Sequence, residues 1–248
     1  MTFSLYSEKK IEVVIINWKR PANVSQIVES IRNQTIKCTI TVCDCHPEEQ
    51  YALDDFTKQN IDRLYRWEHN LGAYSRYLPL ASFDHKYTFF IDDDMLPGNK
   101  CLEHYLECAT KQPNFGVLGQ MGRIIDEDGA YRPKDVPLKN SFIEVDIVVR
   151  AYFVETKYLY NIVKLRWFLN YFYDRLPEDD ILLCASLKLL ENKNCYLIPF
   201  TGDRETLVNK LEMSDRFALC HRPDHYYKRS NLINYLLNSG WIPIKMRK

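Results

Sequence analysis

The sequence has no excess of charge of either sign, no apolar run of membrane-spanning length and no cysteine pair at zinc-binding spacing. Its 33 Lys and Arg residues equal its 33 Asp and Glu residues, so no overall field would draw the chain onto nucleic acid or an anionic membrane. No stretch approaches the roughly 20 apolar residues of a transmembrane helix, and Met1–Lys10 has no apolar segment of signal-peptide length. These absences predict a cytoplasmic protein with no transmembrane segment and no nucleic-acid partner.

The eight cysteines are scattered through a chain that is long enough to bury a sizeable core. This distribution indicates reduced thiols and not a disulfide scaffold. Cys43 and Cys45 precede His46, which could suggest zinc, but a C-x-C-H cluster without a second half is a weak signal. Buried strand cysteines explain this pair better, and buried helix positions explain Cys101 and Cys108.

Short apolar runs alternate with amphipathic segments, a pattern that predicts a mainly parallel sheet covered by helices. The expected strands are Ile11–Ile16, Thr39–Cys43, Leu64–Trp67, Tyr87–Ile91, Phe115–Leu118 and Phe142–Val154, and the expected helices are Val24–Ile31, Ala73–Leu80, Asn99–Thr110 and Ile181–Leu190. No repeat or linker demands a second domain. We therefore predict an α/β fold over residues 1–248, with a central mixed, mostly parallel sheet flanked by helices.

Ligands of open α/β sheets bind beyond the carboxyl ends of the strands. The polar segments that follow the expected strands are Asn17–Asn23, Asp44–Pro47, Asn70–Arg76 and Asp92–Gly98. A binding site is expected among these four segments.

Three adjacent carboxylates, Asp92, Asp93 and Asp94, directly follow the strand Tyr87–Ile91. Their repulsion and their desolvation would both be relieved by a cation. Residues two apart on an extended segment point the same way, so Asp92 and Asp94 are expected to converge while Asp93 points elsewhere. Oxygen ligands too few to encage an ion suit Mg²⁺ or Mn²⁺ that also binds water and a diphosphate. The alternative is a solvated acidic turn or a helix cap.

The acidic run resembles the DxD motif of GT-A glycosyltransferases, and its surroundings resemble those of the family-2 members over most of residues 11–190. The resemblance implies one GT-A-like domain, with a nucleotide-sugar half at about 11–120 and an acceptor and catalytic-base half at about 121–248. It implies metal-dependent transfer from a UDP- or GDP-sugar to a saccharide or other hydroxyl acceptor. Inversion is the expected outcome, and retention stays open because some GT-A relatives with a similar acidic run are retaining. Asp94 would bind the metal directly, Asp92 would help through water or the ribose, and Asp93 would lie among the donor-binding residues.

Two segments at the ends of the first two expected strands also resemble family motifs. In VVIINWKRPANV, Asn17 and Arg20 fill positions that contact the nucleotide, although Arg20 could equally be a solvated loop arginine. In TVCDCH, Asp44 stands where the family places an acid against the nucleobase or ribose.

A third such segment is HNLGAYSRY, which is similar to the family's N-x-G followed by a basic residue. It implies that Asn70, Gly72 and Arg76 lie near the nucleotide and diphosphate. Arg76 could instead pair with Asp84 or a neighbouring acid.

The segment PEDDILLCASL resembles the acid pair at a helix start that carries the catalytic base of inverting members. This implies Asp179 as the base, with Glu178 and Asp180 beside it. The alternative is that the three acids only favour the positive end of the helix dipole.

The C-terminal region offers His221 and His225 as candidates for a third metal ligand, and His221 is preferred by position. Arg150 stands where many relatives carry a small residue near the acceptor, which leaves the acceptor's identity open. The loop-rich section 121–140 could also face the acceptor.

Two other functions stay open. A sugar-phosphate nucleotidyltransferase normally has a glycine-rich loop after its first strand, and NWKRPAN contains no glycine. A catalytically inactive module that binds nucleotide sugars would keep Asp92–Asp94 but would tolerate loss of Asp179.

Overall fold

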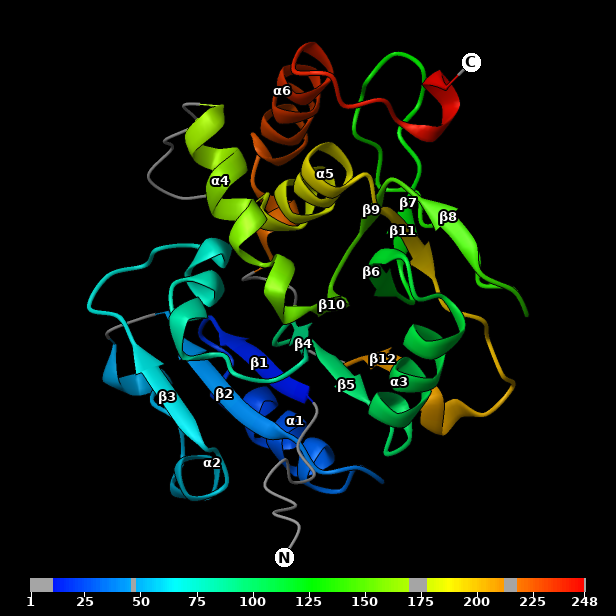
Figure 1. Cartoon of the computed structure of the whole chain (residues 1–248). Coiled ribbons are helices and arrows are strands. Elements are labelled where there is room, and N and C mark those ends of the chain that lie inside the picture. The colour runs from blue at the N-terminus through cyan, green and yellow to red at the C-terminus, as the bar shows by residue number, and fades with distance from the viewer. Residues whose placement is uncertain (1–10, 46–47, 170–177, 212–217, 248) are drawn as a thin grey trace, which may run out of the picture.

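An eight-stranded sheet forms the centre of the computed structural model, which describes residues 11–45, 48–169, 178–211 and 218–247 (Figure 1). The strand order is β3-β2-β1-β4-β10-β6-β11-β8. Four of its seven neighbouring pairs are parallel and three are antiparallel. The prediction of a mixed, mostly parallel sheet is confirmed. Met1–Lys10, His46 and Pro47, considered above, lie outside the described residues.

The strands are β1 (Ile11–Asn17), β2 (Thr39–Asp44), β3 (Arg63–Arg66), β4 (Tyr87–Ile91), β5 (Met95–Pro97), β6 (Phe115–Gly119), β7 (Gly122–Arg123), β8 (Ile143–Val145), β9 (Ile147–Val148), β10 (Ala151–Glu155), β11 (Asn194–Leu197) and β12 (Val208–Lys210). The α-helices are α1 (Pro21–Arg32), α2 (Asp55–Gln59), α3 (Cys101–Lys111), α4 (Tyr160–Phe168), α5 (Asp179–Glu191) and α6 (His225–Asn238). Two short antiparallel pairs, β12 with β5 and β7 with β9, complete the strands.

Helices cover both faces of the sheet, as predicted (Figure 1). Side chains alternate along a strand, so Val13 and Ile15 of β1 pack in one apolar core with α1 and α3. Val14 packs in the second core with α4, α5 and α6. Among the described helices, none has both the length and the apolar character needed to cross a membrane.

Helix α1 shows how the sequence directs this packing. It begins at Pro21, whose fixed φ and missing N–H suit the first helical position. Val24, Ile27, Val28 and Ile31 then recur at helical spacing and are all buried against the sheet. Truncating a fully buried side chain such as Ile27 to Ala would cost about 2–5 kcal/mol of stability.

The strand predicted at Phe142–Val154 is confirmed in type but is divided, and the α-helix predicted at Ala73–Leu80 is wrong in kind. Residues 142–154 form three short strands, because Asp146 leaves the sheet to accept hydrogen bonds at 2.8 Å from the N–H groups of Ile125 and Ile244. Residues 73–80 form 3₁₀ turns and not an α-helix, and Pro79 would break the hydrogen bonding of a continuous helix there.

The thiol predictions hold. Every cysteine is free, and Cys43, Cys45, Cys101 and Cys108 are buried, whereas Cys220 is exposed.

Candidate active site

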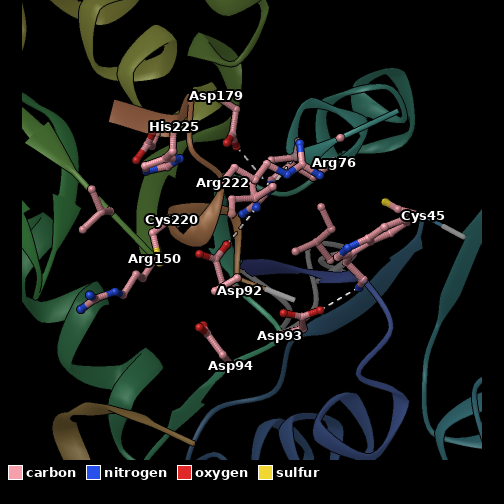
Figure 2. A pocket seen from close by; sticks show the side chains of 18 of the residues that line it. Cys45, Arg76, Asp92, Asp93, Asp94, Arg150, Asp179, Cys220, Arg222 and His225 are labelled. Carbon is pink, nitrogen blue, oxygen red and sulfur yellow. Dashed lines mark hydrogen bonds and ion pairs between the residues drawn. The ribbon is translucent and has the colours of Figure 1, made fainter. Parts of the chain in front are cut away.

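A cavity opens at the edge of the sheet where β1, β2 and β4 end (Figure 2). Its lining includes Ile16 of β1, Cys45 after β2 and Asp92 after β4, and it continues with the start of α5 and residues between 218 and 229. It encloses about 1270 Å³ of empty space, the solvent at its mouth included. This edge is where open α/β sheets bind ligands.

The acidic run forms a turn and does not continue the strand. The Met95 N–H donates to the carbonyl of Asp92 at 3.1 Å, which closes the turn over Asp93 and Asp94. The side chains of Asp92, Asp93 and Asp94 therefore do not alternate as they would along an extended strand. All three residues line the cavity, and the Asp93 carboxylate is directed to the loop after β1, away from Asp94 (Figure 2).

Asp93 holds the loop that follows β1. Its carboxylate accepts a hydrogen bond from the Trp18 N–H at 2.7 Å and pairs with the guanidinium of Arg20. Its carbonyl accepts a bond from the Asn23 amide at 2.8 Å. Burial raises the pKa of Asp93 to about 6, against the lowering effects of Arg20 and the Trp18 N–H. The charge of Arg20, expected at a phosphate, is thus already matched by an internal carboxylate, although Arg20 also lines the cavity.

Arg76 joins the acidic run to helix α5. Its Nη2 lies 2.9 Å from Asp92 Oδ1, and its Nε lies 3.3 Å from Asp179 Oδ2. Arg76 is only 3% exposed, and its Nη1 has no hydrogen-bond partner among the described residues. The alternative pairing with Asp84 is wrong, because Asp84 contacts Arg63 instead.

Burial also changes the protonation of the two carboxyl groups that Arg76 contacts. It raises the pKa of Asp92 to about 7, with Arg76 opposing the shift and Asp94 and Asp179 adding to it. It raises the pKa of Asp179 as well, opposed mainly by Arg76. The Tyr152 hydroxyl donates to Asp179 Oδ2 at 2.8 Å. Both carboxyl groups therefore hold a proton more readily than exposed ones do.

Asp94 has the unmatched oxygen of the acidic run. Its Oδ1 is buried and finds no hydrogen-bond partner within the described residues. Its carbonyl accepts from the Leu211 N–H at 2.8 Å, so the backbone of the residue is held while the carboxylate is not. A buried acceptor of this kind costs free energy unless a partner binds it. The donor set, Asp94 with the second oxygen of Asp92, fits a Mg²⁺ or Mn²⁺ ion that takes its other ligands from water and phosphate.

The three acids at the start of α5 have different surroundings. Asp179 and Asp180 both line the cavity. Asp179 lies beside Arg76, whereas both oxygens of Asp180 accept from Arg229 Nη2, at 2.8 and 2.7 Å. Glu178 is 2% exposed and does not line the cavity. Burial raises the pKa of Glu178 to about 7, against Arg229. The structure thus distinguishes the three acids by their contacts and burial, which the sequence alone did not reveal.

Two of the predicted nucleotide contacts lie outside the cavity lining. Asn17 Nδ2 donates to Asp44 Oδ1 at 2.9 Å, and Asp44 lies 3.4 Å from Arg66. Both side chains are buried where they brace the ends of β1 and β2. Asn70 and Gly72 do line the cavity. Gly72 has φ 73°, which favours glycine, and its N–H donates to Asn70 Oδ1 at 2.8 Å.

The structure brings His225 to the cavity and not the preferred His221. His221 is exposed in a 3₁₀ turn outside the lining. His225 is buried because it begins α6, which packs against the core. Burial lowers the pKa of His225 to about 4, assisted by Arg229. The imidazole is therefore neutral at neutral pH. Figure 2 shows His225 beside Asp179, across the cavity from Asp94.

Part of the cavity wall had no local signal in the sequence. Tyr131 lies in the loop-rich section 121–140, and the guanidinium groups of Arg229 and Arg123 lie 4.2 and 4.9 Å from its ring centroid. These cation–π contacts bring Arg229 of α6 against two residues of the section 121–140. The turn signals of section 121–140 predicted a loop, but nothing in them identified Tyr131.

A cluster of potential metal ligands lies outside the cavity. Within the described residues, three such side chains approach one another only at Glu12, Asp84 and His85. They lie at the amino ends of β1 and β4, opposite the cavity, and Arg63 contacts both acids there, at 2.8 and 3.4 Å. Among the described residues, the carboxylates of the cavity do not form a group of this kind.

Comparison with known proteins rests on structure alone, because no protein-family model and no curated protein sequence matches the chain. The structure of S. aureus TarS is similar, with a TM-score of 0.56 and 15% identity over 90% of this chain and 39% of TarS. The fragment 1–349 of TarS in complex with UDP-GlcNAc gives a TM-score of 0.55 and 15% identity over 92% of this chain and 66% of the fragment. The same fragment in complex with UDP gives 0.56 and 14%, over 92% and 65%.

The chain thus spans less than two thirds of the length of these TarS chains. Identity of 14–15% carries the fold and not the activity. Over about nine tenths of its length, the chain has the GT-A-type fold of TarS.

Proposed function

We propose that this protein is a metal-dependent glycosyltransferase that moves a sugar from a nucleoside-diphosphate sugar to a hydroxyl group of an acceptor, with inversion. One observation carries the proposal. In a GT-A-type fold, the acidic turn and Asp179 line the same cavity, although they are far apart in sequence, and Arg76 joins them. The TarS complexes with UDP-GlcNAc and UDP support a uridine nucleotide as the donor's leaving group.

The acidic turn would hold the donor's diphosphate through a divalent cation. Asp94 offers its unmatched Oδ1, and Asp92 offers the oxygen that Arg76 does not contact. When bound, Mg²⁺ or Mn²⁺ would neutralise the charge that develops on the departing diphosphate. Arg20 and Arg76 would position the acidic turn through their ion pairs with Asp93 and Asp92.

Asp179 would take the proton from the attacking acceptor hydroxyl. Its contacts with Arg76 and Tyr152 both involve Oδ2, so within the described residues Oδ1 is left to accept the proton. The raised pKa of this carboxyl brings it closer to neutral pH, where a general base works best. Tyr152 and Arg76 would orient the carboxylate, so both are positioning residues.

The nucleoside would lie along the loop after β1 and the segment after β3. Trp18, Asn70 and Gly72 line the cavity there. The same loop argues against a nucleotidyltransferase, because it contains no glycine and is closed by the buried pair of Arg20 with Asp93. An inactive binding module is the remaining alternative, and only turnover separates it from an enzyme.

A panel of UDP- and GDP-sugars, incubated with the protein and Mn²⁺, tests the proposal. We expect slow hydrolysis of at least one donor, stopped by a chelator, and inversion at the anomeric carbon as measured by NMR. Metal-dependent binding of UDP without any turnover would identify a binding module. Retention of the anomeric configuration would refute the role given to Asp179.

A further inference from the structure

An arginine-rich wall lines the cavity on the side away from the loop after β1. We define this wall as Arg123, Arg150 and Arg222, all of which line the cavity. Figure 2 shows Arg150 on one side of Asp92 and Cys45 on the other. Arg150 is therefore separated by Asp92 from the side at which the nucleoside is proposed to lie.

The wall carries more positive charge than its own acids neutralise. Asp135 lies 3.3 Å from Arg123 Nε and 3.4 Å from Arg150 Nη1, so one carboxylate serves two guanidinium groups. Arg222 is exposed and forms no ion pair with any residue in the described part of the chain. Among the described residues, the three guanidinium groups of the wall thus share a single carboxylate within ion-pair distance.

The other three arginines that line the cavity differ in this respect. Arg20, Arg76 and Arg229 are buried, and each has a carboxylate partner within 3.0 Å or less. Their charges are matched inside the protein. Arg123 is buried as well, so the accessible guanidinium groups of the cavity lining are those of Arg150 and Arg222.

The backbone fixes Arg150 in place at some cost. Its φ is 69°, in the left-handed region that a residue with a side chain rarely adopts. Its carbonyl accepts a hydrogen bond from the Asp92 N–H at 2.9 Å, which ties it to the acidic turn. The side chain remains 36% exposed and reaches the Met121 sulfur at 3.0 Å. A strained residue that presents an accessible guanidinium to a cavity is typical of a ligand-binding position.

We propose that the arginine-rich wall binds an anionic group, a phosphate or a carboxylate, carried by the acceptor near the hydroxyl that receives the sugar. This inference rests on the proposed function and names its acceptor class. Guanidinium groups bind both anions through paired hydrogen bonds. The donor's diphosphate is assigned to the acidic turn, so the accessible guanidinium groups of Arg150 and Arg222 are left for the second substrate.

Titration with matched pairs of small molecules tests this at one fixed ionic strength. Three pairs, each of a neutral and an anionic compound, are titrated separately into the purified full chain saturated with UDP and Mn²⁺. The pairs are glucose with glucose 6-phosphate, glycerol with glycerol 3-phosphate, and glucose with glucuronate. We expect the anionic member of at least one pair to bind about tenfold tighter or more, the scale of one charge-assisted hydrogen bond. Phosphate and carboxylate members distinguish the two anions.

Substitutions then locate the anion. Arg150→Gln combined with Arg222→Gln should abolish the preference while leaving the Kd for UDP within about twofold, and Arg222→Gln alone, at an exposed position, should reduce it. The control is Arg32→Gln. The side chain of Arg32 is 34% exposed, similar to the 36% of Arg150, but Arg32 lies outside the cavity lining. It should change neither affinity.

Two results overturn the inference: equal binding of every anionic and neutral pair by the unaltered protein, or weaker UDP binding in the double variant with the anion preference kept. Repeating the titrations without UDP and Mn²⁺ separates this inference from the proposed function. An anion preference that needs Arg150 and Arg222 would stand even if no nucleotide bound.

Discussion

Arg76 contacts Asp92 and Asp179 with one guanidinium, at 2.9 and 3.3 Å. Asp92 belongs to the proposed donor side of the cavity, and Asp179 belongs to the proposed acceptor side. A single buried guanidinium is therefore shared between one carboxylate of each side and holds the two together. This arrangement makes the two halves of the site depend on each other.

Arg76→Gln should destabilise the protein by about 3–5 kcal/mol, because it leaves two buried carboxylates without their counter-ion. Adding Asp179→Asn to that variant should recover part of the loss. Urea unfolding of the two single variants and the double variant measures the coupling. Additive effects, within about 0.5 kcal/mol, would show that Arg76 and Asp179 do not act as a pair.

Asp94→Asn should leave the melting temperature of the metal-free protein unchanged or raise it. The change removes a charge from a turn of three carboxylates, and Asp94 Oδ1 has no hydrogen-bond partner to lose among the described residues. Asp55→Asn, at a side chain that is 91% exposed, serves as the control. A clear fall in melting temperature for Asp94→Asn alone would identify a structural carboxylate.

Asp179→Asn should lower the rate of transfer by on the order of a hundredfold or more, the scale of general-base removal, with little change in UDP affinity. Asp180→Asn should be milder for chemistry, because Asp180 is bonded to Arg229 and not to Arg76. Single-turnover kinetics with saturating donor measures the chemical step. If Asp180→Asn proves to be the inactive variant, the base has been assigned to the wrong residue.

Glu178 should make the folded protein less stable as pH rises. Its pKa is raised from an ordinary value of 4.5 to about 7 by burial. The folded state therefore binds more protons between these values, and the free energy of unfolding falls as pH rises through that window. Glu178→Gln should remove this part of the slope and stabilise the protein at pH 8 by about 3 kcal/mol at most. A Gln variant with the slope of the unaltered protein would contradict the shift.

Much of the donor side follows from local sequence. The strands β1, β2 and β4 are short buried runs bounded by polar residues, and their positions agree with prediction to within about one residue. The acidic run was identified because three carboxylates after a buried strand are costly without a partner. The individual roles of Asp92 and Asp93 were not predictable, because they depend on a turn and on Arg20 and Arg76 arriving from other segments.

The acceptor side was harder to predict because tertiary contacts create it. Helix α6 carries charged and aromatic residues on several faces and gave no clear apolar period. Without that helix, nothing in the sequence places Arg229 and His225 beside Tyr131. For the same reason His221 was preferred over His225, since position in the chain was the only guide.

The most direct test of the account is calorimetric titration of UDP into the protein with and without Mn²⁺. Metal-dependent use of a nucleotide predicts that UDP binds in the presence of Mn²⁺, that a chelator removes the binding, and that Asp94→Asn abolishes it without unfolding the protein. UDP binding of equal strength in chelator, or unchanged in Asp94→Asn, would contradict the proposed role of the acidic turn.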